Sequence, residues 1–216
     1  MYSDTTMVRR SKEDALATRS ALLDAAERTF QAKGVSATSL NDIAQAAGTT
    51  RGAIYWHFKD KADLFNAMME RVTLPLEQTL VVAYVEQAAN PVAEIRSAML
   101  EALRLITTDA QTHRVLQIAT HQVEYTAELN AVQERHLRVH RSCLERNHSL
   151  LQQAFATRRI TPPIALERAA RGFQVLVEGL VQQWLLDSAA FDLVEDGRAV
   201  VDVYLAGLGL QEHPPA

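Results

Sequence analysis

Residues 48–65 read GTTRGAIYWHFKDKADLF, and this stretch decides the fold of the N-terminal part of the chain. Thr50 follows a Gly-Thr turn and is placed to cap a short helix from Arg51 to Phe58. Tyr, Trp and His stand side by side at positions 55–57. Consecutive helical residues point in different directions, so these three rings cannot share one buried face. An outward cluster of rings indicates a contact surface.

A second short helix precedes this one. It is expected to begin at Ser39, with Asp42 at the third position, and to stop at Gly48. Two short helices joined by a Gly-containing turn are typical of a helix-turn-helix. In that motif the second helix enters the major groove of DNA, and its N-terminal residues meet the base edges. The stretch therefore predicts a DNA-binding head.

The predicted DNA contacts divide by chemistry. Arg51 can donate two hydrogen bonds to the O6 and N7 atoms of one guanine. The small residues Gly52 and Ala53 would let the start of the helix lie deep in the major groove. Base contacts are expected from Thr50, Arg51, Gly52 and Ala53; phosphate contacts from Tyr55, His57, Lys61, Ser39 and Asn41; and Trp56 lies at the rim. Ile54 and Phe58 are expected to pack inward. Taken singly, side chains such as Tyr55 and His57 are more often ordinary packed or solvated residues than DNA contacts. Their combination with the capped helix and flanking lysines favours DNA.

Composition sets wider limits. The 216 residues carry a formal net charge of −4, which by itself opposes DNA binding, but residues 51–61 and the N-terminal end are locally basic. An apolar content of 48% indicates a globular protein. The first ten residues, MYSDTTMVRR, lack the apolar region of a secretory signal, and no apolar run is long enough for a membrane helix. The single Cys excludes an internal disulfide and suits a reducing cytoplasm.

Apolar residues recur at spacings of three and four throughout, so the chain is predicted to be all-α, with nine helices. They are expected at about residues 11–33, 39–47, 51–58, 61–88, 91–109, 111–124, 127–158, 164–188 and 195–208, with caps at Asp60 and Asn90, a bend at Pro75 and a break at Pro162-Pro163. The expected division is a flexible basic tail (1–10), a helix-turn-helix domain (11–60), a helical body (61–210) and a C-terminal tail (211–216).

Residues 38–65, TSLNDIAQAAGTTRGAIYWHFKDKADLF, resemble the DNA-binding head of the TetR family of bacterial regulators. The family signature is a small helix-turn-helix ending in Tyr-(Trp/His)-His-Phe, followed by Lys-x-(Glu/Asp)-Leu. The N-terminal segment from Met7 and the NP, TD, VEYT and EGLVQQWLL segments resemble the AcrR/TtgR-like branch, which represses multidrug efflux pump genes. Val123 and Thr49 depart from the pattern of that branch.

The resemblance implies a nine-helix TetR-like fold and a cytoplasmic, non-enzymatic repressor without a cofactor. It further implies a homodimer that binds double-stranded palindromic operator DNA, with a body that binds a hydrophobic small-molecule effector and dimerises. An activator is the alternative that the sequence leaves open.

The residues of the body give their own reason for a dimer. The helix expected at 164–188 is apolar or small on nearly all sides, so two of its faces must be covered. Together with the last helix it predicts a four-helix interface with the other subunit, formed by Leu176, Leu180, Trp184, Val200, Tyr204 and Leu208. The alternative is that both helices close a monomeric core.

Polar residues on apolar helix faces predict a ligand pocket in the body. Its expected members are Val72, Leu76, Leu80, Ala83, Tyr84, Ile95, Ala98, Met99, Ala102, Leu116, Thr120, His140, Cys143, Asn147, Gln174, Val177, Glu178 and Val181. An apolar cavity with one carboxylate suits flat, hydrophobic, often cationic drugs. Ordinary core packing is the alternative for each residue.

A second functional class is a metal-binding or redox-sensing helical protein. His136, His140 and Cys143 are spaced to lie on one side of a helix. A solvated helix face explains the same pattern, and the sequence offers no defensible catalytic triad, phosphate loop or dinucleotide fingerprint.

Overall fold

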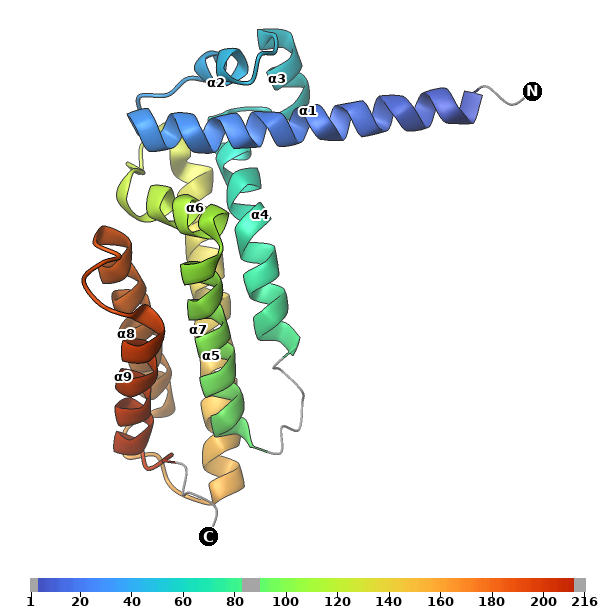
Figure 1. The fold of residues 1–216 in the computed structure, drawn as a ribbon. Coiled ribbons are helices and arrows are strands. Elements are labelled where there is room, and N and C mark those ends of the chain that lie inside the picture. Colours follow the sequence, from blue (N-terminus) through green and yellow to red (C-terminus); the bar gives the residue numbers. More distant parts are fainter. Residues whose placement is uncertain (1–3, 83–89, 212–216) are drawn as a thin grey trace. The chain divides into compact units, whose positions relative to one another are not determined.

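The structure is a computed structural model that describes the backbone of residues 4–82 and 90–211, and the side chains of residues 12–73 and 90–211 (Figure 1). The described part is entirely helical, which confirms the all-α prediction. Its elements are α1 (Asp4–Lys33), α2 (Leu40–Ala46), α3 (Arg51–His57), α4 (Lys61–Val82), α5 (Pro91–Thr108), α6 (Ala110–His121), the 3₁₀ helix η1 (Ala127–Leu129), α7 (Asn130–Arg158), α8 (Leu166–Leu186) and α9 (Leu193–Gly207). Among the described helices, none is long and apolar enough to cross a membrane.

Local signals fix most of the helix ends. The amide of Asp63 donates to the Asp60 carboxylate at 2.8 Å, and that of Ala93 donates to Asn90 at 3.2 Å, so both predicted caps are confirmed. The break at Pro162-Pro163 is also present. The predicted start near Ser11 is wrong, because α1 already begins at Asp4. The sequence Ser11-Lys-Glu-Asp resembles a capping box, but Met and Arg in the preceding Met-Val-Arg-Arg segment are good helix formers, and the helix continues through them.

Two predictions for α4 concern residues that the structure does not fully describe. The side chains of residues 74–82 are not described, and residues 83–89 lie outside the described part. The bend at Pro75 and the helix end near Ala88 therefore stay predictions.

The chain forms two compact units, one of residues 1–71 and 114–135, the other of residues 72–113 and 136–216. The division falls within α4, α6 and α7 rather than at residue 60, where the sequence places a domain boundary.

In the first unit, α1, α2 and α3 pack together around buried apolar side chains. Ile54 and Phe58 are completely or almost completely buried there, as predicted. The rings of Phe30 and Phe65 add an aromatic contact, with centroids 6.0 Å apart. This core supports α3 from one side and leaves its other side exposed.

In the second unit, α9 packs against both α5 and α8 (Figure 1). Glycines allow the close approach. Gly197 of α9 faces the side chain of Leu103 on α5, and Gly172 of α8 faces the ring of Tyr204 on α9. A Cβ atom at either glycine would overlap these neighbours, so the helices approach more closely than larger residues would permit.

Candidate nucleic-acid interface and ligand cavity

The helix-turn-helix is held by capping hydrogen bonds. The amide of Asp42 donates to Ser39 Oγ at 3.2 Å, and the amide of Ser39 donates to the Asp42 carboxylate at 2.9 Å, which forms a capping box at the predicted helix start. The Ser39 hydroxyl also bonds this carboxylate at 2.6 Å, and these bonds from Ser39 lower the pKa of Asp42. Both donors of Ser39 are thus engaged within the cap, while Asn41 beside it is exposed.

The recognition helix α3 starts as predicted. Thr50 is its N-cap, and its hydroxyl accepts from the amide of Ala53 at 3.2 Å. Arg51 and Gly52 are exposed and Ala53 is half-buried, so the helix start can be approached from outside. The Arg51 guanidinium lies over the Tyr55 ring, 5.7 Å from its centroid. This contact steadies a long cation at the end of the helix.

The aromatic cluster faces solvent. Trp56 is 73% exposed, the Tyr55 ring is half-exposed, and His57 is intermediate. The Trp56 and His57 rings meet edge to face with centroids 4.6 Å apart. Burial, and secondarily the charge of Arg19, lower the pKa of His57, which favours the neutral imidazole near pH 7. His57 is therefore suited to act as a neutral hydrogen-bond donor.

Lys61 conflicts with its predicted role as a phosphate contact. Its side chain is only 5% exposed, and its Nζ donates to the carbonyl oxygens of Ser36 and Thr38. Nζ also lies 3.1 Å from a carboxylate oxygen of Glu128. A buried ammonium group with these partners stabilises the first unit. Lys61 is therefore not among the residues that we propose contact DNA.

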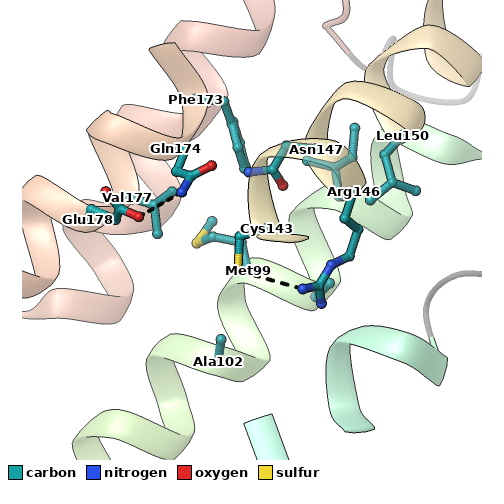
Figure 2. A pocket seen from close by; sticks show the side chains of 12 residues that line it. Met99, Ala102, Cys143, Arg146, Asn147, Leu150, Phe173, Gln174, Val177 and Glu178 are labelled. Atoms are coloured by element: carbon teal, nitrogen blue, oxygen red, sulfur yellow. Dashed lines mark hydrogen bonds between the residues drawn. The ribbon is translucent and has the colours of Figure 1, made fainter. Parts of the chain in front are cut away.

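The second unit contains a cavity of about 160 Å³ between α5, α7 and α8 (Figure 2). Nine predicted pocket residues line it: Ile95, Ala98, Met99, Ala102, Cys143, Asn147, Val177, Gln174 and Glu178. Three further lining residues were not predicted: Arg146, Leu150 and Phe173. Leu150 lies seven positions after Cys143 and Phe173 four positions before Val177, and this helical spacing is a signal that could have found them. Arg146 gives no such signal, because a charged residue on a polar helix is usually solvated.

Other predicted pocket residues lie elsewhere. Val72, Leu116, Thr120, His140 and Val181 are absent from the cavity wall. Val72 is packed in the core, Thr120 is exposed, and Leu116 and Thr120 belong to the first unit. His140 instead contacts the side chains of Gln174 and Glu178, which line the cavity. The predictions for Leu76, Leu80, Ala83 and Tyr84 lie outside the described side chains.

The metal-binding alternative finds no support in the described part of the chain. No group of three or more His, Cys, Asp or Glu side chains is arranged there to hold an ion. The His140 ring lies 3.2 Å from the Glu178 carboxylate, and Cys143 accepts a hydrogen bond from Arg146.

The predicted dimer residues on α8 and α9 need correction. Trp184 and Leu208 are buried within the single chain, and the Trp184 ring packs on His113 with centroids 4.9 Å apart. The Tyr204 hydroxyl donates to the carbonyl oxygen of Ala169 at 2.8 Å. These three side chains therefore stabilise the subunit itself. The large apolar residues exposed on the described parts of these helices are Val175, Leu186, Val200 and Val203, of which only Val200 was predicted.

Two family models and several known proteins match the chain. Residues 22–68 match the bacterial regulatory proteins of the tetR family, and residues 90–210 match the C-terminal region of MAATS-type transcriptional repressors. Over 204 residues the chain is 34% identical to the HTH-type transcriptional regulator TtgR of Pseudomonas putida, covering 94% of this chain and 97% of TtgR.

Two solved structures are similar over nearly the whole chain. One is NalD, the secondary repressor of the MexAB-OprM multidrug efflux pump in Pseudomonas aeruginosa, with 37% identity, a TM-score of 0.82, and coverage of 91% of this chain and 98% of NalD. The other is a complex of triclosan with SmeT, the repressor of the Stenotrophomonas maltophilia pump SmeDEF. It has 30% identity, a TM-score of 0.79, and coverage of 93% of this chain and 100% of SmeT.

Proposed function

The chain belongs to the TetR family of bacterial regulatory proteins, with a MAATS-type repressor C-terminal region, and on that premise we propose that it represses a multidrug efflux operon and is released from its palindromic operator by a small hydrophobic effector. That it is a DNA-binding transcriptional repressor, and not an enzyme, follows from the family itself. What we propose beyond the family is the kind of operon that is repressed and the kind of effector that releases the DNA.

The observation that carries the proposal is the largely apolar cavity between α5, α7 and α8, in a chain that also presents an exposed recognition helix. Apolar walls with a few polar groups suit a small organic ligand. Relatives named as efflux-pump repressors, and the triclosan complex of SmeT, support the same assignment.

Binding is proposed to use the exposed start of α3. Thr50, Arg51, Gly52 and Ala53 face the bases, while Asn41, Tyr55 and His57 contact phosphates and Trp56 lies at the rim. In a homodimer, two such helices would occupy successive major grooves roughly 34–36 Å apart.

Release is proposed to be a population shift. The effector favours a conformation of the body in which the two heads no longer match the operator, and the difference in affinity between the conformations releases DNA. We take α4 as the lever, because its first half belongs to the unit with α3 and its second half to the unit with the cavity.

DNA recognition is tested by gel-shift titration on the DNA that flanks the protein's own gene. Arg51→Ala is expected to weaken binding to the specific site by about 1–3 kcal/mol through one base position. Arg138→Ala, an exposed arginine of α7, is the matched control and should leave binding unchanged. If Arg51→Ala reduced the affinity for specific and random DNA equally, Arg51 would not contact a base.

Release is tested with a variant that fills the cavity. Ala102→Leu adds three carbons to the wall and is expected to retain operator binding while losing release by a drug that acts on the wild type. Ser97→Leu, on an exposed position of α5, is the matched control and should respond normally. Unchanged release of Ala102→Leu would place the effector elsewhere.

A further inference from the structure

The cavity holds polar atoms that lack partners, and these atoms restrict the chemistry of its ligand. Most of the wall is apolar. The polar side chains are Arg146 and Asn147 on α7, and Gln174 and Glu178 on α8 (Figure 2). A ligand that satisfies the unpartnered groups gains hydrogen bonds that the described protein groups do not supply.

Gln174 presents an unpartnered acceptor. The residue is only 4% exposed, and its Nε2 lies 2.8 Å from a Glu178 carboxylate oxygen and 3.2 Å from the carbonyl oxygen of His140. Both of those oxygens accept hydrogen bonds, so the amide nitrogen must face them and the amide orientation is fixed. Its Oε1 is buried without a hydrogen-bond partner within the described part of the chain. In Figure 2 this oxygen points away from Glu178, towards the α7 side.

Arg146 presents an unpartnered donor. Its Nη1 is buried and has no hydrogen-bond partner among the described residues. Its Nη2 donates to the thiol sulfur of Cys143 at 3.6 Å, which is a weak acceptor. A guanidinium in this position favours an anionic oxygen, because hydrogen bonds between two charged groups are the strongest available to it.

Glu178 differs from these two groups because its carboxylate already has partners. It accepts from Gln174 Nε2 and lies 3.2 Å from His140 Nδ1. Both contacts involve Glu178 Oε1, and a cationic ligand beside this carboxylate would also meet the charge of Arg146. The cationic drugs that the sequence suggests are therefore disfavoured.

We propose that the cavity selects a small aromatic acid that also carries a hydroxyl group. The acid oxygen accepts from Arg146, the hydroxyl donates to Gln174 Oε1, and the ring lies against the apolar wall. The volume of about 160 Å³ is close to the roughly 150 Å³ of apolar cavities that admit benzene, so one ring fits this conformation. The inference rests on the proposed role of the cavity as the effector site.

The test is isothermal titration calorimetry on the full chain without DNA. The probes are the three hydroxybenzoate isomers, benzoate, which lacks the hydroxyl, and 4-hydroxybenzylamine, which reverses the charge. At least one hydroxybenzoate is expected to bind more tightly than benzoate, and the amine is expected not to bind.

Variants assign the two contacts. Arg146→Met is expected to weaken the best hydroxybenzoate roughly tenfold to a hundredfold. Arg146→Lys retains the charge and should restore part of the affinity. Arg141→Met, an exposed arginine of the same helix, is the matched control. Gln174→Met should reduce the hydroxybenzoate-to-benzoate affinity ratio to about one. Because this is a ratio within one variant, a general loss of stability cancels from it.

Three outcomes overturn the inference: no saturable binding of any hydroxybenzoate, equal binding of the amine, or unchanged affinity in Arg146→Met. If any of these outcomes is found but another hydrophobic compound still releases the protein from operator DNA, the proposed function stands and only this inference is wrong. If the hydroxybenzoates bind as expected but never release DNA, the cavity assignment stands and the release mechanism falls.

Discussion

The ammonium group of Lys61 links three segments of the first unit, which contains the recognition helix. It donates to the carbonyl oxygens of Ser36 and Thr38 at 3.3 and 3.1 Å and pairs with Glu128. Lys61→Met keeps much of the side-chain volume but leaves two carbonyl groups short of a donor, so we expect a loss of about 1–3 kcal/mol in the free energy of unfolding, measured in urea. Lys59→Met, its exposed neighbour, is the control and should change little. Equal effects of both substitutions would contradict the structural role.

His57 should make stability depend on pH. Because its pKa is lowered by burial and by Arg19, the unfolded chain takes up a proton near the ordinary value of 6.5, whereas the folded chain does so only at lower pH. Stability rises with pH where the unfolded state binds more protons, so acidification through this window lowers the free energy of unfolding. We expect a shallower pH dependence for His57→Gln in urea titrations from about pH 5 to about pH 7.5. Identical slopes for the two proteins would argue against the shift.

At the scale of helices, two glycines of α8 should respond oppositely to the same substitution. A Cβ atom at Gly172 would overlap the hydroxyl of Tyr204 and lie 3.2 Å from its Cζ, whereas one at Gly179 meets nothing within 4 Å. Gly179→Ala should stabilise by up to about 1 kcal/mol through helix propensity. Gly172→Ala displaces Tyr204 from its bond to Ala169 and should destabilise by about 1–3 kcal/mol. Thermal unfolding of both variants measures these changes in stability. A stabilised Gly172→Ala would contradict the packing of α8 on α9.

Features encoded within a few residues could be predicted, whereas those that depend on distant partners could not. The caps at Ser39, Thr50 and Asn90 follow from side chains that bond their own helix starts. Nine cavity residues follow from helical spacing, because it places them on common faces. The burial of Lys61 depends on Glu128, which is 67 positions away, and the inward face of Trp184 depends on His113. Spacing within one helix does not identify which neighbour covers each face.

At the scale of the whole molecule, regulation requires that one unit influence the other. The recognition helix lies in the first unit and the cavity in the second, and the division between the units falls within α4, α6 and α7. A ligand can change operator affinity only by as much as its own affinity differs between conformations. Cavity variants should therefore alter effector response more than operator binding, since the exposed start of α3 contains none of the cavity residues.

Dimerisation is the last part of the proposal, because one short recognition helix per chain would contact only half of the proposed palindromic operator. Val203 of α9 is 74% exposed and, with Val175 of α8, forms apolar surface on adjacent packed helices. Val203→Lys is expected to shift the protein from dimer to monomer in analytical ultracentrifugation and to weaken operator binding roughly a hundredfold or more, through loss of the second contact. Leu137→Lys, an exposed apolar position of α7, is the control and should leave both unchanged. A monomeric wild type, or a fully dimeric Val203→Lys, would place the interface elsewhere.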